Sequence, residues 1–186
     1  MSNPQFADEV RQGLSKSPKT LSSKWFYDAR GDTLFRNIMA MPEYYLTDCE
    51  AEIFKRAGPT LLKALDHQPF ELVELGAGDG AKTQYLIEQF IKAEVLFTYR
   101  PIDISANAIE ILGELINRRW PRLPFSPVRG DYFDALSRLG KHITGRPRLV
   151  LFPGGNIGNF IPAEARAFLR RLHDFMRQGD LLLTGF

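Results

Sequence analysis

Apolar residues change their spacing along the chain near residue 65. Beyond that point, short continuous apolar runs alternate with segments in which apolar residues recur every three or four positions. The continuous runs predict strands at residues 70–75, 97–102, 125–129, 149–152 and 181–184. The periodic segments predict helices at residues 83–92, 106–118 and 162–176. This alternation is typical of a parallel sheet with helices on both faces, so the sequence predicts an α/β fold.

The first 65 residues follow a different pattern, because turn residues interrupt their apolar positions and no alternating strands emerge. Apolar residues at helical spacing predict a helix over Asp32–Met39, which Pro42 then ends. A second helix is expected to begin after Thr47 or Asp48, either of which can cap it, and to end at Gly58-Pro59.

The change of pattern divides the chain into an N-terminal helical segment, residues 1–65, and an α/β domain, residues 66–186. Within the domain, Pro127 weakens the strand at 125–129 and predicts an edge position for it. The strand at 181–184 would leave an apolar edge with unpaired backbone groups, which proteins normally cover. We therefore expect a partner, or a C-terminal segment that this chain lacks, to cover the fifth strand.

Composition and charge exclude several classes of protein. Of the 186 residues, 44% are hydrophobic and 25% are charged, which favours a globular chain over a disordered one. The net charge of +2 gives no strong field for collecting nucleic acid. No apolar run approaches the roughly 20 residues that a membrane helix needs. We therefore expect a small-molecule ligand, and neither a nucleic acid nor a membrane as a partner.

The rarer residue types add two expectations. Cys49 is the single cysteine, and the first ten residues lack the basic and apolar regions of a signal peptide, so a cytoplasmic location is expected. His67, His142 and His173 are scattered, with no carboxylate or cysteine at the spacing of metal ligands. The sequence therefore predicts no metal site.

A glycine-rich loop over residues 74–82 follows the first strand of the domain and includes Gly76 and Gly78. Glycines at a strand-to-helix turn let the backbone approach a nucleotide cofactor closely. The spacing alone fits both S-adenosylmethionine and a nicotinamide dinucleotide. Glu74 favours the first, because a carboxylate there can meet the ammonium group of a methionine moiety and would repel a pyrophosphate.

Two further loops carry residues that suit the same ligand. Asp103 follows the second strand, where a carboxylate can accept both hydroxyls of a ribose. After the third strand, Asp131 and Tyr132 stand where an adenine could be held by its amino group and covered by a ring. Three such loops at successive strand ends are more specific than any one glycine motif.

The loop after the fourth strand, residues 153–159, is rich in small residues and leaves room for a substrate. Methyl transfer to an amine needs a neutral nitrogen, and hence acceptors for its N–H groups. Asn159 and a backbone carbonyl such as that of Gly154 can accept them. The same loop also fits an ordinary connection to the next helix, capped by an asparagine, and the two roles are compatible.

The chain resembles the S-adenosylmethionine-dependent histidine Nα-methyltransferases of ergothioneine biosynthesis. The resemblance covers nearly the whole chain and rests on residues 24–31, 34–35, 42–45, 47, 50, 74–78, 82, 103–105, 130–131 and 157–159. Gly155 and Asn156 depart from it, since small hydroxyl residues are usual there, and Asp48 stands where arginine is common. The family's C-terminal part, which completes the sheet and recognises the imidazole, has no counterpart in this sequence.

The resemblance implies a class I methyltransferase fold, a Rossmann-like doubly wound sheet that is incomplete at its C-terminal edge. It implies that Tyr44 and Asn159 hold the carboxylate and amine of an amino acid, and that Tyr27 lines the same pocket. It places a further group around the cofactor: Gly76, Lys82, Asp103, Asp131 and Tyr132.

The expected reaction is in-line methyl transfer from S-adenosylmethionine to the α-amine of an amino acid, and histidine is the favoured substrate. Positioning alone can supply the catalysis, so the sequence singles out no catalytic residue. Two alternatives stay open at this point. One is an NAD(P)-dependent oxidoreductase built on the same glycine loop, and the other is a truncated cofactor-binding module without turnover.

Overall fold

The fold is a five-stranded parallel sheet in a computed structural model that describes residues 4–22, 25, 29–140 and 144–186. The strands are β1 (Phe70–Leu75), β2 (Phe97–Asp103), β3 (Val128–Arg129), β4 (Arg148–Phe152) and β5 (Leu181–Thr184). Every neighbouring pair is parallel, and the order across the sheet is β3-β2-β1-β4-β5. The strand order therefore reverses between β1 and β4, which is where open α/β sheets hold their ligands.

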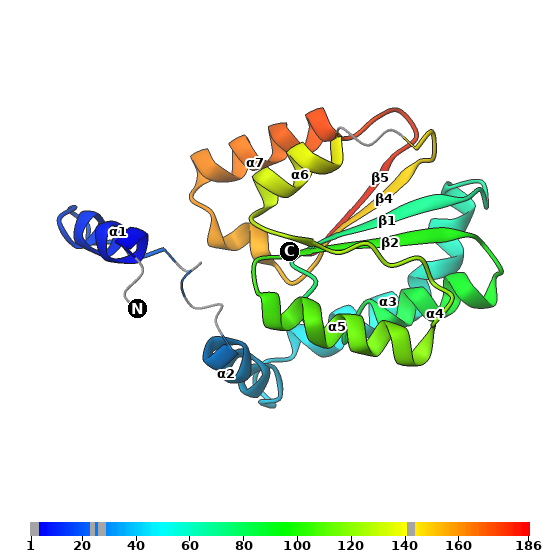
Figure 1. The fold of residues 1–186 in the computed structure, drawn as a ribbon, viewed down its shortest axis with the longest axis horizontal. Coiled ribbons are helices and arrows are strands. Elements are labelled where there is room, and N and C mark those ends of the chain that lie inside the picture. The colour runs from blue at the N-terminus through cyan, green and yellow to red at the C-terminus, as the bar shows by residue number, and fades with distance from the viewer. Residues whose placement is uncertain (1–3, 23–24, 26–28, 141–143) are drawn as a thin grey trace.

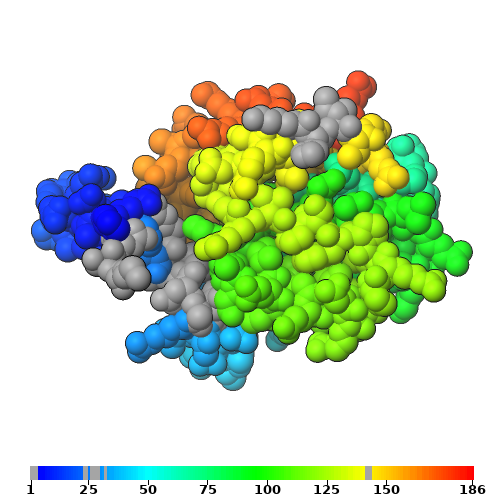
Figure 2. Space-filling view, viewed as in Figure 1, coloured from blue at the N-terminus to red at the C-terminus, as the bar shows by residue number. Residues whose placement is uncertain are grey.

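Helices cover both faces of the sheet (Figure 1). The elements before the sheet are α1 (Pro4–Leu14), α2 (Ala29–Met39) and α3 (Leu46–Ala64). The helical elements that connect the strands are α4 (Gln84–Lys92), α5 (Ala106–Arg119), α6 (Tyr132–Gly140), the 3-10 turn Asn156–Asn159 and α7 (Pro162–Phe175). In Figure 1, α3, α4 and α5 lie on one face and α6 and α7 on the other, whereas α1 and α2 stand apart from the sheet. Figure 2 shows α1 protruding from the body of the molecule.

The central strands bury both of their faces, because successive side chains of a strand point to opposite sides. In β1, Leu72 packs into the layer of α3, α4 and α5, and Val73 packs into the layer of α6 and α7. In β4, Leu151 and Val150 divide between the two layers in the same way. Four of the five continuous apolar runs therefore form strands at the predicted places. The bounds of β1 and β5 are those predicted, and β2 and β4 are each one residue longer.

Helix α3 continues through Pro59 to Ala64, so the prediction that it ends at Gly58-Pro59 is wrong. The side chain of Gln89 on α4 explains the continuation. Its Nε2 donates to the carbonyl of Phe54 at 2.7 Å, and its Oε1 accepts the N–H of Gly58 at 3.1 Å. These are the two backbone groups that an uninterrupted helix would pair at this turn, so the amide supports the backbone beside the proline. A Cβ on Gly58 would lie 2.4 Å from Gln89 Oε1, which is why only glycine fits there.

The region of the third strand also differs from prediction. Only Val128–Arg129 form β3, while Phe125 makes an isolated bridge to Tyr99. Pro127 between them has no N–H to donate, and the strand lies at the edge of the sheet as expected. The following helix, α6, has no counterpart among the predicted elements. It begins at Tyr132, just after a carboxylate that can cap it.

A buried ionic cluster lies at the opposite end of the sheet from the glycine loop. Arg100 Nε donates to Glu71 Oε1 at 2.7 Å, and Arg148 Nε lies 3.5 Å from Glu71 Oε2. Arg148 also donates to the carbonyl of Phe175 at 2.9 Å, and its guanidinium stacks 4.2 Å from that ring. A buried charge is tolerated only when it is paired and hydrogen-bonded, and these contacts meet that requirement. The cluster ties β1, β2 and β4 to the end of α7.

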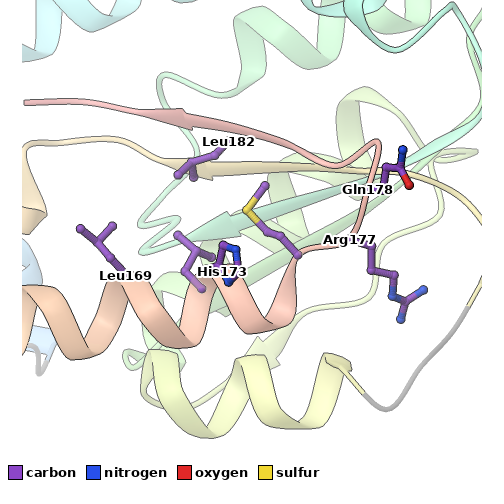
Figure 3. A pocket seen from close by; sticks show the side chains of 7 residues that line it. Leu169, His173, Arg177, Gln178 and Leu182 are labelled. Atoms are coloured by element: carbon purple, nitrogen blue, oxygen red, sulfur yellow. The ribbon is translucent and has the colours of Figure 1, made fainter.

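A groove of about 490 Å³ runs between α7 and β5 (Figure 3). The residues that line it are Leu169, Leu172, His173, Met176, Arg177, Gln178 and Leu182. Since β5 is the last strand in the sheet order, it forms one edge of the sheet, as predicted, and the groove adjoins it. Among the described residues, no helix is long and apolar enough to cross a membrane.

Replacing Gln89 with alanine is expected to destabilise the fold. The substitution leaves Phe54 O and Gly58 N–H without the amide that pairs them, so we expect a loss of about 1–3 kcal/mol in the free energy of unfolding. Urea denaturation measures it. Lys92→Ala, at an exposed position of the same helix, serves as the control and should stay within about 0.5 kcal/mol of the wild type. Equal losses in the two variants would contradict this account of the Pro59 turn.

Candidate active site

The side chain and backbone of Asp103 join the loops that follow β1, β2 and β3. Its Oδ2 accepts the N–H of Gly78 at 2.8 Å, and its Oδ1 accepts the N–H of Ser105 at 2.9 Å. Its carbonyl oxygen accepts the N–H of Gly130 at 3.0 Å. Asp103 is only 8% exposed. One residue at the end of β2 therefore holds three loops together at the carboxyl edge of the sheet.

The glycine loop turns by means of backbone conformations that other residues rarely adopt. Gly76 and Gly78 have φ values of +74° and +55°. The N–H groups of Gly76 and Ala77 both donate to the carbonyl of Ile102, at 2.8 and 3.2 Å, which fixes the loop against β2. A Cβ on Gly78 would meet no described atom within 4 Å, so open space lies beside it. This space leaves room for a ligand beside the backbone of Gly78, and the binding of a cofactor there stays a prediction.

Glu74 lies beneath this loop and is 2% exposed. The hydroxyl of Thr83 donates to its Oε1 at 2.5 Å, and the hydroxyl of Tyr99 donates to its Oε2. Burial raises the pKa of Glu74 to about 7, although the two hydrogen bonds and the charge of Lys82 pull it down. This position differs from the expected contact with a ligand ammonium group, because the carboxylate is buried beneath the loop and bonded there to two protein hydroxyls. Glu74 instead fastens β1 to β2 and to the start of α4.

Asp131 and Tyr132 lie at the start of α6. Asp131 Oδ1 accepts the N–H groups of Phe133 and Asp134 at 2.8 and 3.1 Å, which caps the helix and orients the carboxylate. The ring of Tyr132 packs edge-on against Phe152 at 5.6 Å. The Tyr132 hydroxyl lies 2.8 Å from where a Cβ on Gly76 would be. The structure therefore brings Tyr132 to the glycine loop through its hydroxyl, with its ring fixed in the core.

The loop after β4 brings two further predicted residues to this edge. Gly154 has φ +81°, and Asn159 is exposed at the end of the 3-10 turn. The sequence marks Asn156 only as a departure from the family pattern, yet it connects two loops. Its Nδ2 donates to the carbonyl of Pro153 at 3.0 Å and lies 3.5 Å from where a Cβ on Gly76 would be. The loops after β1 and β4 therefore meet at Asn156.

Glu50 on α3 reaches the same edge from the helical segment. Its carboxylate pairs with Lys82 Nζ, and its Oε1 accepts the N–H of Gly154 at 2.5 Å. The side chains of Lys82 and Glu50 are 22% and 15% exposed. Sequence reasoning used Glu50 only as part of the resemblance, and no local pattern assigns it these partners.

Of the two tyrosines of the predicted substrate pocket, the structure describes only Tyr44. Tyr27 lies outside the described residues. Tyr44 is half-buried, and its ring meets that of Phe35 edge-on at 6.3 Å. Within the described part of the chain, no hydrogen bond links Tyr44 to Gly154 or Asn159. Their roles in holding an amino acid thus stay predictions.

Solved structures of low sequence identity share this arrangement of strands and helices. One is a S-adenosyl-L-methionine-dependent methyltransferase of Methanococcus maripaludis, described as putative, with a TM-score of 0.57 and 16% identity over 86% of this chain and 64% of that one. Another is the magnesium protoporphyrin IX methyltransferase of Synechocystis, with a TM-score of 0.54 and 13% identity over 84% of this chain and 73% of that one. The fold is thus that of the class I methyltransferases, as predicted.

The chain belongs to the family described as "Histidine-specific methyltransferase, SAM-dependent", which matches residues 6–186. It is 40% identical to the histidine N-alpha-methyltransferase of Mycolicibacterium smegmatis and 36% identical to that of Mycobacterium tuberculosis, in each case over 95% of this chain and 54% of the relative. It is 30% identical to the 4-dimethylallyltryptophan N-methyltransferase of Claviceps fusiformis, over 87% of this chain and 46% of the relative. The chain therefore spans about half the length of the curated relatives it matches.

Replacing Glu74 with glutamine is expected to change how stability depends on pH. The folded state raises the pKa of this carboxyl from 4.5 to about 7, so it binds the proton more tightly than the unfolded chain does. The wild type should therefore lose stability as the pH rises from about 4.5 to 7, by on the order of 3 kcal/mol from this group. Glu74→Gln cannot ionise and should lack that loss.

The measurement is urea unfolding of both proteins at pH 5 and pH 8, with the exposed Glu110→Gln as the control for removing a surface carboxyl. A gap between the wild type and Glu74→Gln that is the same at both pH values would contradict the raised pKa.

Proposed function

We propose that the chain binds S-adenosylmethionine at the carboxyl ends of β1, β2 and β3. We further propose that the protein methylates the α-amine of an amino acid, with histidine as the favoured substrate. The observation that carries the proposal is the junction at Asp103, where three loops meet beside open space at Gly78. Membership of a histidine-specific methyltransferase family supports the substrate. A cytoplasmic location and a small-molecule amino-acid substrate belong to the same proposal.

The residues at this edge fit the chemical groups of that cofactor. Asp103 remains slightly exposed, and its carboxylate can accept the ribose hydroxyls. Asp131 is oriented by its backbone bonds so that its second oxygen can accept an adenine amino group. Lys82 can pair with the carboxylate of the methionine moiety. When bound, S-adenosylmethionine supplies a methyl group made electrophilic by the positive sulfur.

The loop after β4 would hold the acceptor. The carbonyl of Gly154 and the side chain of Asn159 can accept the N–H groups of a neutral amine and leave its lone pair free to attack. Aligning two reactants in this way can supply about 7–11 kcal/mol of the barrier, so no dedicated base is required. Tyr44 and Tyr27 would bind the carboxylate of the amino acid.

The test separates cofactor binding from turnover. Thermal shift should show stabilisation by S-adenosylhomocysteine and none by NAD, because the carboxylates near the glycine loop disfavour a pyrophosphate. Stabilisation by NAD alone would favour the oxidoreductase and overturn the proposal. Incubation with S-adenosylmethionine and histidine, tryptophan or phenylalanine, read by mass spectrometry, identifies the acceptor. Binding of S-adenosylhomocysteine without methylation of any amino acid would favour the cofactor-binding module.

Asp103→Ala is expected to weaken the binding of S-adenosylhomocysteine. Charge-assisted hydrogen bonds contribute about 1.5–3 kcal/mol, which corresponds to roughly a tenfold to hundredfold rise in Kd. Isothermal titration calorimetry measures it. Glu110→Ala removes a carboxylate from the exposed side of α5 and should leave Kd unchanged. An unaltered Kd in Asp103→Ala would remove Asp103 from the ribose role.

A further inference from the structure

Glu50 on α3 contacts several of the loops that follow the strands. Besides Lys82 and the N–H of Gly154, it adjoins the turn after β5, where a Cβ on Gly185 would lie 2.4 Å from Glu50 Oε1. Gly185 in turn donates to the carbonyl of Phe152 at 3.0 Å. One carboxylate from α3 therefore meets the loops after β1, β4 and β5.

The environment of this carboxylate makes its interactions stronger than those of a surface pair. Glu50 and Lys82 are 15% and 22% exposed, so water and salt screen their attraction less than at an open surface. A lysine side chain is flexible and loses rotamer freedom when it is held. Pairing with Glu50 fixes the direction of the Lys82 ammonium group before any ligand arrives. A preorganised charge binds a ligand more tightly than one that must first be ordered.

The second oxygen of Glu50 acts on the substrate loop. Gly154 has φ +81°, a conformation that only glycine adopts readily, and the loop around it needs contacts that hold it in place. Its N–H donates to Glu50 Oε1, so the position of Gly154 is set from α3. The carbonyl of the same residue is the group that the proposed function assigns to the substrate amine.

We propose that Glu50 is a positioning residue that links the two ligand pockets: one oxygen directs Lys82 toward the carboxylate of the cofactor, and the other holds Gly154 for the amino-acid substrate. The inference rests on the proposed function for its ligands. The link itself rests only on the contacts of Glu50.

The variant Glu50→Gln separates the two halves of this role. Glutamine keeps a carbonyl oxygen for the N–H of Gly154 but carries no charge to hold Lys82. We expect the NMR amide resonance of Gly154 and its protection from hydrogen exchange to be retained, while the Kd for S-adenosylhomocysteine rises about threefold to tenfold. In Glu50→Ala, both the protection and the affinity should fall. A merely structural role would make the two readouts change together in both variants.

Glu52→Gln is the matched control, because Glu52 lies on the same helix, pairs with Arg56 at 2.9 Å and is 61% exposed. It should change neither readout. A double-mutant cycle with Lys82→Met tests the route of the effect. In the Lys82→Met background, Glu50→Gln should weaken S-adenosylhomocysteine binding no further. An equal weakening in both backgrounds would show that Glu50 does not act through Lys82 and would overturn the proposal.

The two readouts also distinguish this inference from the proposed function. If the wild type binds no S-adenosylhomocysteine, the proposed function fails, and the Gly154 amide in Glu50→Ala still tests the link to the loop. If the wild type binds it, then unchanged Gly154 protection in Glu50→Ala, or wild-type affinity in Glu50→Gln, overturns the role given to Glu50.

Discussion

The loops at the carboxyl ends of β1, β2 and β3 depend on one buried carboxylate, that of Asp103. Each loop leaves its strand with backbone N–H groups that have no partner in the sheet, and a buried unpaired N–H is costly. Asp103 accepts from Gly78 and Ser105 through its side chain and from Gly130 through its carbonyl. A hydrogen bond to Asp103 holds the loop at Gly78, where an added Cβ would meet no described atom within 4 Å. The site thus follows from how the strand ends satisfy their hydrogen bonds.

Features that arise from local pattern were predictable from the sequence. The bounds of β1 and β5 follow from continuous apolar runs, and the glycine loop follows from positions where only glycine tolerates a left-handed backbone. The end of α3 was not predictable in this way. Pro59 signals the end of a helix, but Gln89, 31 residues from Gly58, supplies the amide that lets the helix continue. Only the packing of α3 on α4 brings that amide to the proline.

The candidate site likewise has features that follow from local sequence pattern and others that depend on long-range contacts. Motif position correctly placed Asp103 and Gly76 at the carboxyl edge of the sheet, because parallel strands place their following loops at one edge. It placed Glu74 wrongly, because the sequence does not show that Thr83 and Tyr99 converge on that carboxylate. The contact between Glu50 and Gly154 joins residues 104 apart in sequence, and a glutamate four residues into a helix carries no local sign of such a partner. Long-range polar contacts of this kind become visible only when the sheet order is known.

The charges around the glycine loop also bear on the ligand. Glu50 is paired with Lys82, and the charge of Lys82 lowers the pKa of Glu74 while that of Asp103 raises it. A pyrophosphate would bring negative charge close to the buried carboxylate of Glu74. A sulfonium cofactor brings positive charge together with one carboxylate, which Lys82 can meet. The field therefore favours S-adenosylmethionine over a dinucleotide by the sign of the interaction, and it does so although Glu74 itself is too deeply buried to touch either ligand.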